Sequence, residues 1–587
     1  MVKTFSKFFV KSILKLFYRV EVKGMEHYKA AGKRVVIISN HLSFLDGLLI
    51  AGFVPDKPIM IIHSLWFNNI FKQIARFAPI DQNSSFIIKQ IVKKIKNDDK
   101  CVIFPEGRLS STGCMMKAYP GAYKIAKLAD ANILPIYIYG VQFTKFARFK
   151  PRSKRRKLPK IVINIHESIK PSSIESSNKD IGSQILQELM SSSKFKSANL
   201  EMNLWEALLY RRKFLHAKAV VIEDEQRKPL TISKLIKNAI NLSYDIEQRS
   251  KSKEVIGILL ANSCIAMVNF FAMQAVARVP CMLDCNKDHD EILANCIAAG
   301  LNKVYTSEEF IKSNHLAALV EKLEQAGITI LYLEKAQTKR KNTIRRKHKY
   351  KILPDEPAVV LFTKNPENKS RGVVLSHKNI LANINQMSSV IDFNSNDTVF
   401  NAMPISSAFG LNTGTLLAIL SGMKVFLYPQ QLHYKLIPEL IYDIEASILF
   451  STNNLLENYA KHAHSYDFRS LRYVFSWGEK LQQSTFTTWS ELYGIKIFDS
   501  YGCTETASII ALNTALFNKK DTVGKILPGI KLELQEKDSS LIVSGPNLML
   551  GYLSDKKIVS LKQAYNTGDT VEIDSEGYVT INAREQD

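Results

Sequence analysis

A histidine and an aspartate five residues apart are the first side chains that could do chemistry. His41 and Asp46 lie in the stretch KRVVIISNHLSFLDGLLI, residues 33–50. A carboxylate that holds one ring nitrogen of an imidazole fixes its tautomer and makes it more basic, so it can take a proton from a hydroxyl. No cysteine lies nearby, and no serine stands in a nucleophile-elbow context. The pair therefore predicts a general base acting on a substrate hydroxyl, without a covalent enzyme intermediate.

A second polar turn, in CVIFPEGRLSSTG (residues 101–113), combines an arginine with a glycine. Its first apolar residues predict a strand over 102–104 that runs into Pro105 and Glu106. Arg108 offers a forked donor suited to phosphate, and Gly107 lets a ligand approach the backbone closely. The turn therefore predicts contacts to an anionic ligand.

Buried strands must position both turns. The β-branched run 35–38 predicts a strand that ends at Asn40, where a polar turn opens a helix, and two more strands are predicted over 133–140 and 160–166. Loops at strand ends are where α/β domains usually carry reactive groups. After about residue 200, strand and helix patterns alternate again, which is typical of repeated α/β units on parallel sheets.

Two long apolar stretches, 255–277 and 408–428, raise the question of membrane-spanning helices. Both contain Asn, Gly or Ser. We therefore expect strand–turn–helix units buried in an α/β core.

Four segments in this order, NHLSFLD, FAPIDQ, FPEGRLS and ILPIYI, resemble the glycerolipid acyltransferase family, the PlsC-like group that acylates lysophospholipids or glycerol phosphate. The resemblance implies that His41 is the general base and that Asp46 orients it. The residues that it implies for binding the phosphate-bearing acceptor are Asn40, Glu106, Gly107 and Arg108.

Further blocks, among them LFTKNPENKSRGVVLSHKNI (361–380), DSYGCTETA and YNTGDTVEIDSEG, resemble the acyl-adenylating, AMP-binding superfamily. In that superfamily the matching threonine and glutamate serve the adenylate and magnesium, the aspartate binds ribose, and the arginine is at the hinge. The nucleotide-binding residues that the resemblance implies are Thr363, Arg371, Gly372, Tyr501, Thr504, Glu505, Asp569 and Arg584.

The nucleotide loop departs from the superfamily pattern, which is approximately TSGSxGxPKG. Pro366 removes an amide donor and Glu367 places a carboxylate near the phosphate oxygens. Trp477 stands where the superfamily has a small residue beside the adenine, and Ser407 replaces a frequent histidine. The sequence ends at Asp587, before the superfamily's mobile C-terminal subdomain with its adenylating lysine. We therefore expect a vestigial site that uses ATP and magnesium only if it is still active.

The two resemblances together are similar to bifunctional proteins in which a 2-acylglycerophosphoethanolamine acyltransferase is fused to an acyl-[acyl-carrier-protein] synthetase. The expected fold class is α/β in both halves. The expected organisation is a membrane-interface helix (1–22), an acyltransferase domain (23–195), a linker (196–215) and an AMP-binding-like large domain without its C-terminal subdomain (216–587).

The chain of 587 residues carries a formal charge of +24, concentrated at 150–160 and 339–351. Such clusters suit an anionic membrane, a phosphorylated ligand or an acidic carrier protein, although they can also be solvated faces. Nucleic acid is not expected as a partner, because no finger, RNP-type motif or basic zipper is present. Seven cysteines without CxxC spacing predict neither a metal site nor disulfides, and they favour a reducing compartment.

The N-terminal segment MVKTFSKFFVKSILKLFYRV has a basic residue at every fourth position from Lys3 to Arg19. At 100° per residue these form one stripe of a helix, opposite an apolar stripe of Val2, Phe5, Phe9, Ile13, Leu16 and Phe17. We expect this helix to lie in a membrane interface, at the cytoplasmic face of the inner membrane, and the alternative is a helix docked on its own domain.

Three hypotheses follow. The first is an acyltransferase that moves a fatty acyl group from acyl carrier protein or acyl-CoA to a lysophospholipid, which requires no cofactor. The second adds ATP-dependent acyl activation by the C-terminal half. The third is a non-enzymatic scaffold that binds a lipid surface or an acyl carrier.

Overall fold

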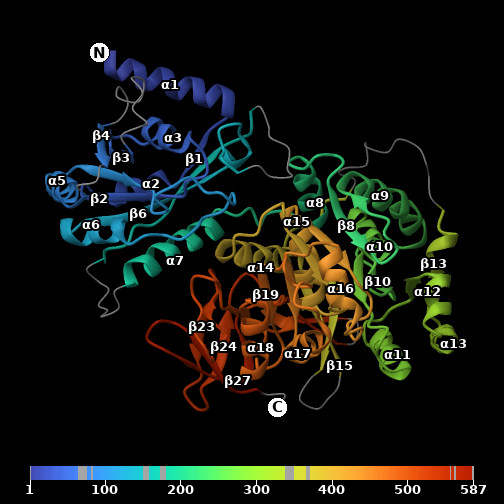
Figure 1. The fold of residues 1–587 in the computed structure, drawn as a ribbon. Helices are drawn as coiled ribbons and strands as arrows, with labels where there is room; N and C mark the ends of the chain where they lie inside the picture. The colour runs from blue at the N-terminus through green and yellow to red at the C-terminus, as the bar shows by residue number, and fades with distance from the viewer. Residues whose placement is uncertain are drawn as a thin grey trace. The chain divides into compact units, whose positions relative to one another are not determined.

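Two units with separate cores make up the computed structural model (Figure 1). It describes residues 2–63, 76–80, 84–149, 158–171, 180–337, 350–364, 370–554, 557–560 and 563–584. Unit 1 comprises Met1–Ala198 with Asp392–Asn394, and unit 2 comprises Asn199–Ile391 with Ser395–Asp587. Residues 150–157 of the basic cluster at 150–160, most of the cluster at 339–351 and loop residues 365–369 lie outside the described residues.

Unit 1 is built on a seven-stranded sheet in the order β1-β7-β6-β2-β5-β3-β4. Neighbouring strands are parallel except for β6 and β7, which are antiparallel. The strands are β1 (Glu21–Lys23), β2 (Val35–Ser39), β3 (Ile59–His63), β4 (Arg76–Ile80), β5 (Lys100–Ile103), β6 (Asn132–Tyr139) and β7 (Val162–Ile165). The β-branched runs therefore form the strands that their composition predicts, within two residues at either end.

Helices cover both faces of this sheet. They are α1 (Val2–Tyr18), α2 (Met25–Ala30), α3 (Asp46–Phe53), α5 (Ser84–Lys96), α6 (Gly121–Ala129) and α7 (Ile181–Lys196). Successive residues of β2 alternate between two cores: Val35 and Ile37 pack with α1, α2 and α3, whereas Val36 and Ile38 pack with α5, α6 and α7. This alternation is the period of two expected of a strand that is buried on both faces.

Unit 2 has three sheets. One has eight strands in the order β13-β12-β10-β11-β14-β15-β25-β26, another has nine in the order β22-β21-β20-β19-β18-β16-β17-β8-β9, and the third has four in the order β23-β24-β27-β28. Parallel pairs form the middle of the two large sheets, for example β10 with β11 and β18 with β19. The expected α/β fold class is confirmed in both units.

The bounds of the strands in unit 2 are β8 (Val220–Asp224), β9 (Leu230–Thr231), β10 (Val255–Ile258), β11 (Val279–Met282), β12 (Lys303–Thr306), β13 (Thr329–Tyr332), β14 (Pro357–Lys364), β15 (Ser370–Ser376), β16 (Thr398–Asn401), β17 (Lys424–Leu427), β18 (Ile448–Ser451), β19 (Tyr473–Ser476), β20 (Ile497–Tyr501), β21 (Ala511–Leu512), β22 (Lys525–Ile526), β23 (Lys531–Leu534), β24 (Ser540–Ser544), β25 (Gly551–Ser554), β26 (Lys557–Ser560), β27 (Tyr565–Ile573) and β28 (Val579–Ala583).

Its α-helices are α8 (Leu204–Arg212), α9 (Ile232–Arg249), α10 (Cys264–Ala275), α11 (His289–Ala298), α12 (Glu308–Ser313), α13 (Ala317–Gln325), α14 (His377–Val390), α15 (Leu417–Ser421), α16 (Leu436–Asp443), α17 (Asn453–His462) and α18 (Gln483–Tyr493), and a π-helix spans Phe409–Leu416.

Two segments differ from expectation. The stretch 408–428 forms the π-helix, α15 and then β17, so a helix precedes the strand instead of following it. Gly422, in the left-handed conformation at φ 84°, ends α15 and allows the turn into β17. The segment 196–215, expected as a linker, contains α8, because Leu204, Trp205 and Leu208 are buried.

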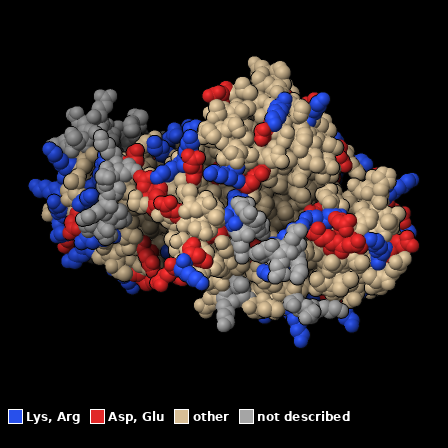
Figure 2. Space-filling model, turned by 90° about the horizontal axis from the view of Figure 1, so that it is seen from below, with Lys and Arg blue, Asp and Glu red and all other residues tan. Residues whose placement is uncertain are grey.

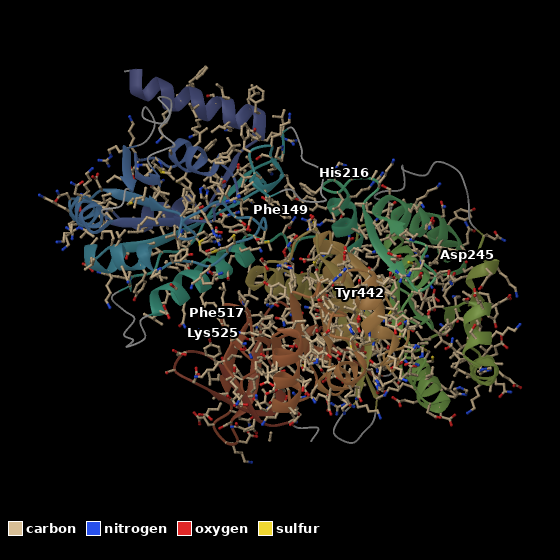
Figure 3. All side chains as sticks on the ribbon, in the orientation of Figure 1. Phe149, His216, Asp245, Tyr442, Phe517 and Lys525 are labelled. Atoms are coloured by element: carbon tan, nitrogen blue, oxygen red, sulfur yellow. The ribbon has the colours of Figure 1, made fainter. Side chains whose placement is uncertain are left out.

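Polar side chains are also held inside unit 2. Asp245 on α9 is buried and accepts hydrogen bonds from Tyr305 and Arg249. Lys525 lies 5.0 Å from the ring centroid of Phe517 (Figure 3).

On the face drawn in Figure 2, basic and acidic side chains are interspersed with broad uncharged areas. Among the described residues, no helix combines the length and the apolar character needed to cross a bilayer.

Candidate functional site

The predicted site residues of unit 1 lie in two turns that follow the ends of neighbouring strands. β2 and β5 are parallel, with Ile38 opposite Ile103, so their carboxyl ends lie at the same edge of the sheet. The chain leaves β2 through His41, and it leaves β5 through Glu106. Parallel pairing of β2 and β5 therefore brings together two turns that are 65 residues apart in sequence.

His41 and Asp46 form the predicted pair. Nδ1 of His41 lies 3.1 Å from Oδ2 of Asp46, and this oxygen also accepts the backbone N–H groups of Leu42 at 2.7 Å and Ser43 at 2.8 Å. Asp46 is fully buried at the start of α3, whereas the side chain of His41 is 22% exposed. Burial raises the pKa of Asp46, and the hydrogen bond from His41 counteracts part of that rise. With Nδ1 held in this way, Nε2 is the ring nitrogen left for a substrate.

An aromatic ring holds the imidazole from one side. The rings of His41 and Phe104 are stacked, with centroids 4.1 Å apart and an interplanar angle of 18°. The backbone is held as well, because the N–H of Ser110 donates to the carbonyl of His41 at 2.8 Å. Phe104 was not singled out from the sequence, where its position directly before Pro105 and Glu106 would have been the only signal.

Glu106 supports His41 instead of facing a ligand. Its Oε1 accepts the backbone N–H of His41 and its Oε2 accepts that of Met116, both at 2.9 Å. Only 1% of the residue is exposed, and burial raises the pKa of Glu106 to about 7. The predicted contact of this carboxylate with the acceptor is therefore replaced by a positioning role.

Asn40 has a comparable position inside the fold. Its Nδ2 donates to the carbonyl of Ile138 at 3.0 Å, and its Oδ1 accepts the N–H of the same residue at 2.8 Å. Asn40 is fully buried, so its amide ties the end of β2 to β6 and fixes the start of the His41 turn. It does not present a surface to a substrate, in contrast to the expected binding role.

Gly107 and Arg108 are the exposed part of this turn. Gly107 is in the left-handed region with φ 63°, and a side chain there would have only Tyr119, 3.9 Å away, within van der Waals range. A ligand can therefore approach the backbone at Gly107. Among the described residues, Arg108 forms no ion pair or hydrogen bond, which leaves its guanidinium free for an anion.

Seven of the eight residues predicted for nucleotide binding line one cavity of about 150 Å³ in unit 2. They are Thr363, Arg371, Tyr501, Thr504, Glu505, Asp569 and Arg584. Thr363 and Arg371 face each other across the antiparallel pair of β14 and β15. Gly372, the eighth, is on β15 opposite Phe362 and does not line the cavity.

The polar groups of this cavity contact one another. The hydroxyl of Tyr501 donates to Oδ2 of Asp569 at 2.6 Å, and that of Tyr552 donates to Oε1 of Glu505 at 2.8 Å. Arg584 donates to the carbonyl of Gly478. A nucleotide entering the cavity would have to replace these contacts.

Trp477 also lines the cavity. Its ring is stacked on Phe409 at 4.7 Å and 10°, and its Nε1 is buried without a hydrogen-bond partner among the described residues. Ser407 bonds locally: its hydroxyl donates to the carbonyl of Pro404 and accepts the N–H of Gly410 at the start of the π-helix. The cavity volume is below the roughly 300 Å³ that is usual for small-molecule sites.

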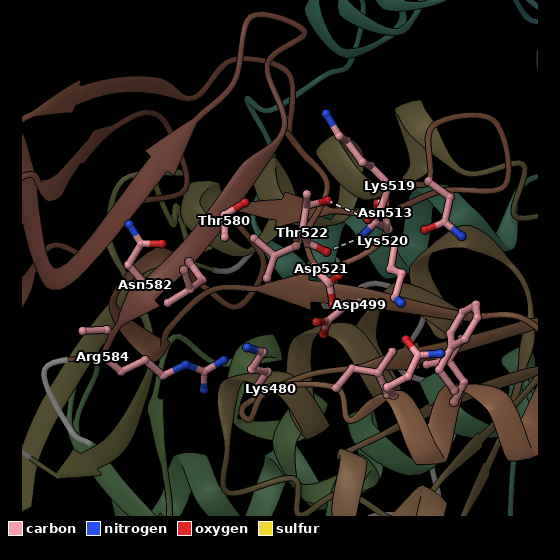
Figure 4. A pocket seen from close by; sticks show the side chains of 18 residues that line it. Lys480, Asp499, Asn513, Lys519, Lys520, Asp521, Thr522, Thr580, Asn582 and Arg584 are labelled. Carbon is pink, nitrogen blue, oxygen red and sulfur yellow. Dashed lines mark hydrogen bonds between the residues drawn. The ribbon is translucent and has the colours of Figure 1, made fainter.

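A larger cavity of about 420 Å³ adjoins this one and shares Arg584 with it. Figure 4 shows Asp499 near its middle, with Lys480 and Lys520 to either side. Burial raises the pKa of Asp499 to about 7. Of the residues that line this cavity, Arg584 is the one that the sequence analysis assigned to a site. Among the described residues, no group of three or more His, Cys, Asp or Glu side chains is arranged to hold a metal ion.

Two family models match the chain. The model described as AMP-binding enzyme matches residues 216–553, and the model described as acyltransferase matches residues 19–139. The acyltransferase match includes both turns of the unit 1 site, and the AMP-binding match includes the cavity-lining residues up to Tyr552.

Curated relatives are similar over part of the chain. A long-chain-fatty-acid–CoA ligase of Escherichia coli O6:H1 is 28% identical over 259 residues, which are 41% of this chain and 46% of that protein. A probable 4-coumarate–CoA ligase 2 of Dictyostelium discoideum is 26% identical over 250 residues, 39% of this chain and 45% of that protein. The chain thus spans a little under half the length of these relatives.

Solved structures show the same fold. A benzoate CoA ligase from Burkholderia xenovorans LB400 has a TM-score of 0.58 at 18% identity, covering 66% of this chain and 81% of that one. An anthranilate CoA ligase in complex with anthranoyl-AMP has a TM-score of 0.58 at 16% identity, covering 67% and 79%.

Proposed function

The chain belongs to the AMP-binding enzyme family and carries an acyltransferase domain ahead of that region, and we propose that it transfers a fatty acyl group from an acyl thioester to the free hydroxyl of a lysophospholipid. The observation that carries the proposal is the pair of His41 and Asp46, 3.1 Å apart at the end of β2. An acylglycerophosphoethanolamine is the acceptor that the sequence resemblance favours.

In this reaction Nε2 of His41 takes the proton of the acceptor hydroxyl as its oxygen attacks the thioester carbonyl. The tetrahedral intermediate then expels the thiolate, the carbon–sulfur bond breaks, and the protonated imidazole returns the proton to sulfur. Asp46 stabilises the imidazolium and holds its orientation. Arg108, exposed beside Gly107, binds the phosphate of the acceptor.

The acyl donor is a thioester of CoA or of acyl carrier protein. Several curated relatives are named as CoA ligases, which supports CoA thioesters as the chemistry of this family. The formal charge of +24 suits an acidic carrier protein equally. Transfer rates with the two donors, measured side by side on the purified protein, decide between them.

The test of the proposal is acyl transfer to lysophosphatidylethanolamine in liposomes, with labelled thioester as donor. Replacing His41 by Gln should reduce transfer by about 10²–10⁴-fold, because the general base is lost. The matched control is His166→Gln, a histidine of the same unit that hydrogen-bonds to Ser197 outside the site. Transfer by His41→Gln at the rate of the control would overturn the assignment.

The second candidate function is ATP-dependent acyl activation, and the observation in its favour is that seven of the predicted nucleotide-binding residues line one cavity. Thr504 and Glu505 would hold a magnesium-bound phosphate, although Oε1 of Glu505 already accepts the hydroxyl of Tyr552, so the fit is partial. The small volume, Trp477 and the composition of 363–372 support a cavity that does not adenylate. Pyrophosphate release from ATP plus fatty acid, without added thioester, would show that it does.

The third candidate, a non-enzymatic scaffold, predicts liposome binding without any acyl transfer and with no effect of changes at His41.

We propose that the protein acts peripherally at the cytoplasmic face of the inner membrane. Fractionation of cells producing the full chain tests this location.

A further inference from the structure

Helix α1 has two different faces. Val10, Leu14 and Tyr18, spaced four residues apart, pack into the core shared with α3, and Leu14 is only 5% exposed. The opposite face carries five large apolar side chains that are exposed by 37–78%. They are Phe8, Phe9, Ile13, Leu16 and Phe17.

Lysines attach the inner face to unit 1. Nζ of Lys7 donates to the carbonyl groups of Val54, Pro55 and Asp56 at 2.8, 3.1 and 2.9 Å, directly after the last residue of α3. Nζ of Lys11 lies 5.6 Å from the ring centroid of Phe53. Two residues of the basic stripe, Lys7 and Lys11, are therefore used to dock the helix on the rest of unit 1, and burial lowers the pKa of Lys7.

The apolar face consequently has no partner among the described residues of its own unit. Figure 1 shows α1 running along the outside of unit 1. A helix of 17 residues is about 25 Å long, which is enough to lie in a membrane interface with its apolar side inserted. Among the described helices none is long and apolar enough to span a bilayer, so an in-plane position is the one that this helix offers.

We propose that the outward face of α1 is a docking surface for an anionic lipid bilayer and seats the acyltransferase unit where its lipid acceptor is held. The role given to this surface, delivery of the enzyme to its lipid acceptor, rests on the proposed function. The binding of the surface to a bilayer does not depend on it. Lys15 and Arg19 are exposed and border the apolar face, which complements anionic headgroups. If two copies of the chain paired symmetrically through this face, Lys15 and Arg19 of one copy would instead lie beside the same positive residues of the other.

Binding of the full chain to vesicles tests the surface without any substrate. The altered protein is Phe9→Ser/Leu16→Ser, at side chains that are 57% and 78% exposed. The matched control is Leu432→Ser/Leu492→Ser, two leucines of unit 2 that are 53% and 63% exposed. We expect at least tenfold weaker binding to phosphatidylglycerol-containing vesicles for the first pair only. Equal binding by both double variants would overturn the proposal.

Vesicles of different lipid composition test whether the positive charge on α1 contributes to binding. Wild-type protein should bind vesicles containing phosphatidylglycerol more tightly than vesicles of phosphatidylcholine alone, and Lys15→Glu should shrink this difference several-fold. If Phe9→Ser/Leu16→Ser instead turns a dimer into a monomer in light scattering, with vesicle binding unchanged, the face joins two copies and the lipid proposal is wrong.

The same proteins separate the two proposals. His41→Gln should bind vesicles like wild type. If wild-type protein binds in the expected manner but transfers no acyl group, the docking surface stands and the proposed function fails. If transfer is observed but vesicle binding is independent of Phe9 and Leu16, the enzyme assignment stands and the docking surface fails.

Discussion

Oδ2 of Asp46 accepts three hydrogen bonds at once, one from Nδ1 of His41 at 3.1 Å and two from the backbone of Leu42 and Ser43. One buried oxygen thus fixes both the imidazole and the turn that carries it. Its other oxygen, Oδ1, is buried without a hydrogen-bond partner among the described residues. Orientation of His41 therefore depends on a carboxylate that has little freedom to move.

Asp46→Asn keeps the size of this side chain but removes its charge. Transfer should fall by about 10²–10⁴-fold, because the imidazolium loses its stabilising partner. Asp46→Ala should in addition leave two backbone N–H groups unpaired, at a cost of about 1–3 kcal/mol each. Thermal unfolding and transfer rates measured on both variants check this order. Full transfer by Asp46→Asn would contradict a catalytic pair.

Glu106 makes the stability of unit 1 dependent on pH. Burial raises the pKa of Glu106 in the folded protein to about 7, above the value near 4.3 of an unfolded glutamate. Between these values the folded state binds more protons at Glu106 than the unfolded state does. The contribution of Glu106 to stability is therefore fully present below about pH 4 and is lost as the pH rises through 7. The loss is on the order of 3 kcal/mol.

Hydrogen exchange of the β2 and β5 amides, measured at several pH values between 5 and 7, detects this loss locally. Glu106→Gln should flatten the pH dependence in these strands. Asp499→Asn is the matched control, because burial also raises the pKa of Asp499 to about 7 but in unit 2. A pH dependence of β2 and β5 that persists in Glu106→Gln would show that another group causes it.

Four strands of unit 1, β2, β5, β6 and β7, were predictable because their apolar, β-branched runs mark them by composition alone. The strands β1, β3 and β4 were not predicted. The pairing of the two side chains in the first turn was also predictable, since His41 and Asp46 are close in sequence. The roles of Asn40 and Glu106 were not, because they depend on Ile138 and Met116, whose positions only the folded sheet determines. A polar residue beside a catalytic one can equally well bind substrate or support its neighbour.

The convergence of the predicted nucleotide-binding residues on one cavity in unit 2 was foreseen only through the resemblance to the acyl-adenylating superfamily. Tyr501 and Asp569 are 68 residues apart in sequence, and no periodicity relates them. The pairing of Thr363 with Arg371 depends on the antiparallel register of β14 and β15, which no sequence pattern specifies. For α1 the helix was predictable from spacing, but which face docks was not, since Lys7 finds its carbonyl partners near α3 and not in the helix itself.

Trp477→Gly should enlarge the cavity that the predicted nucleotide-binding residues line. The stacked ring is removed from beside Phe409, so ATP or AMP should bind more tightly, by at least tenfold in titration calorimetry. The cost to stability should be at most about 3–5 kcal/mol, the range for losing a large aromatic side chain. Adding Asp569→Ala to this variant should abolish the gain, because Asp569 lines the same cavity. Unchanged affinity in Trp477→Gly would mean that the tryptophan is not what limits binding.

Lys7 links helix α1 to the pair of His41 and Asp46. It holds the carbonyl groups that follow α3, and Asp46 is the first residue of that helix, so movement of α3 moves the carboxylate. Lys7→Met should destabilise this attachment by about 1–3 kcal/mol, seen as faster hydrogen exchange in α3. It should also lower kcat several-fold while KM for the acyl donor is unchanged, and Lys7→Arg should restore the rate. Lys29→Met, an exposed lysine of α2, is the control. Equal kinetics of Lys7→Met and Lys29→Met would show that α1 does not influence the pair of His41 and Asp46.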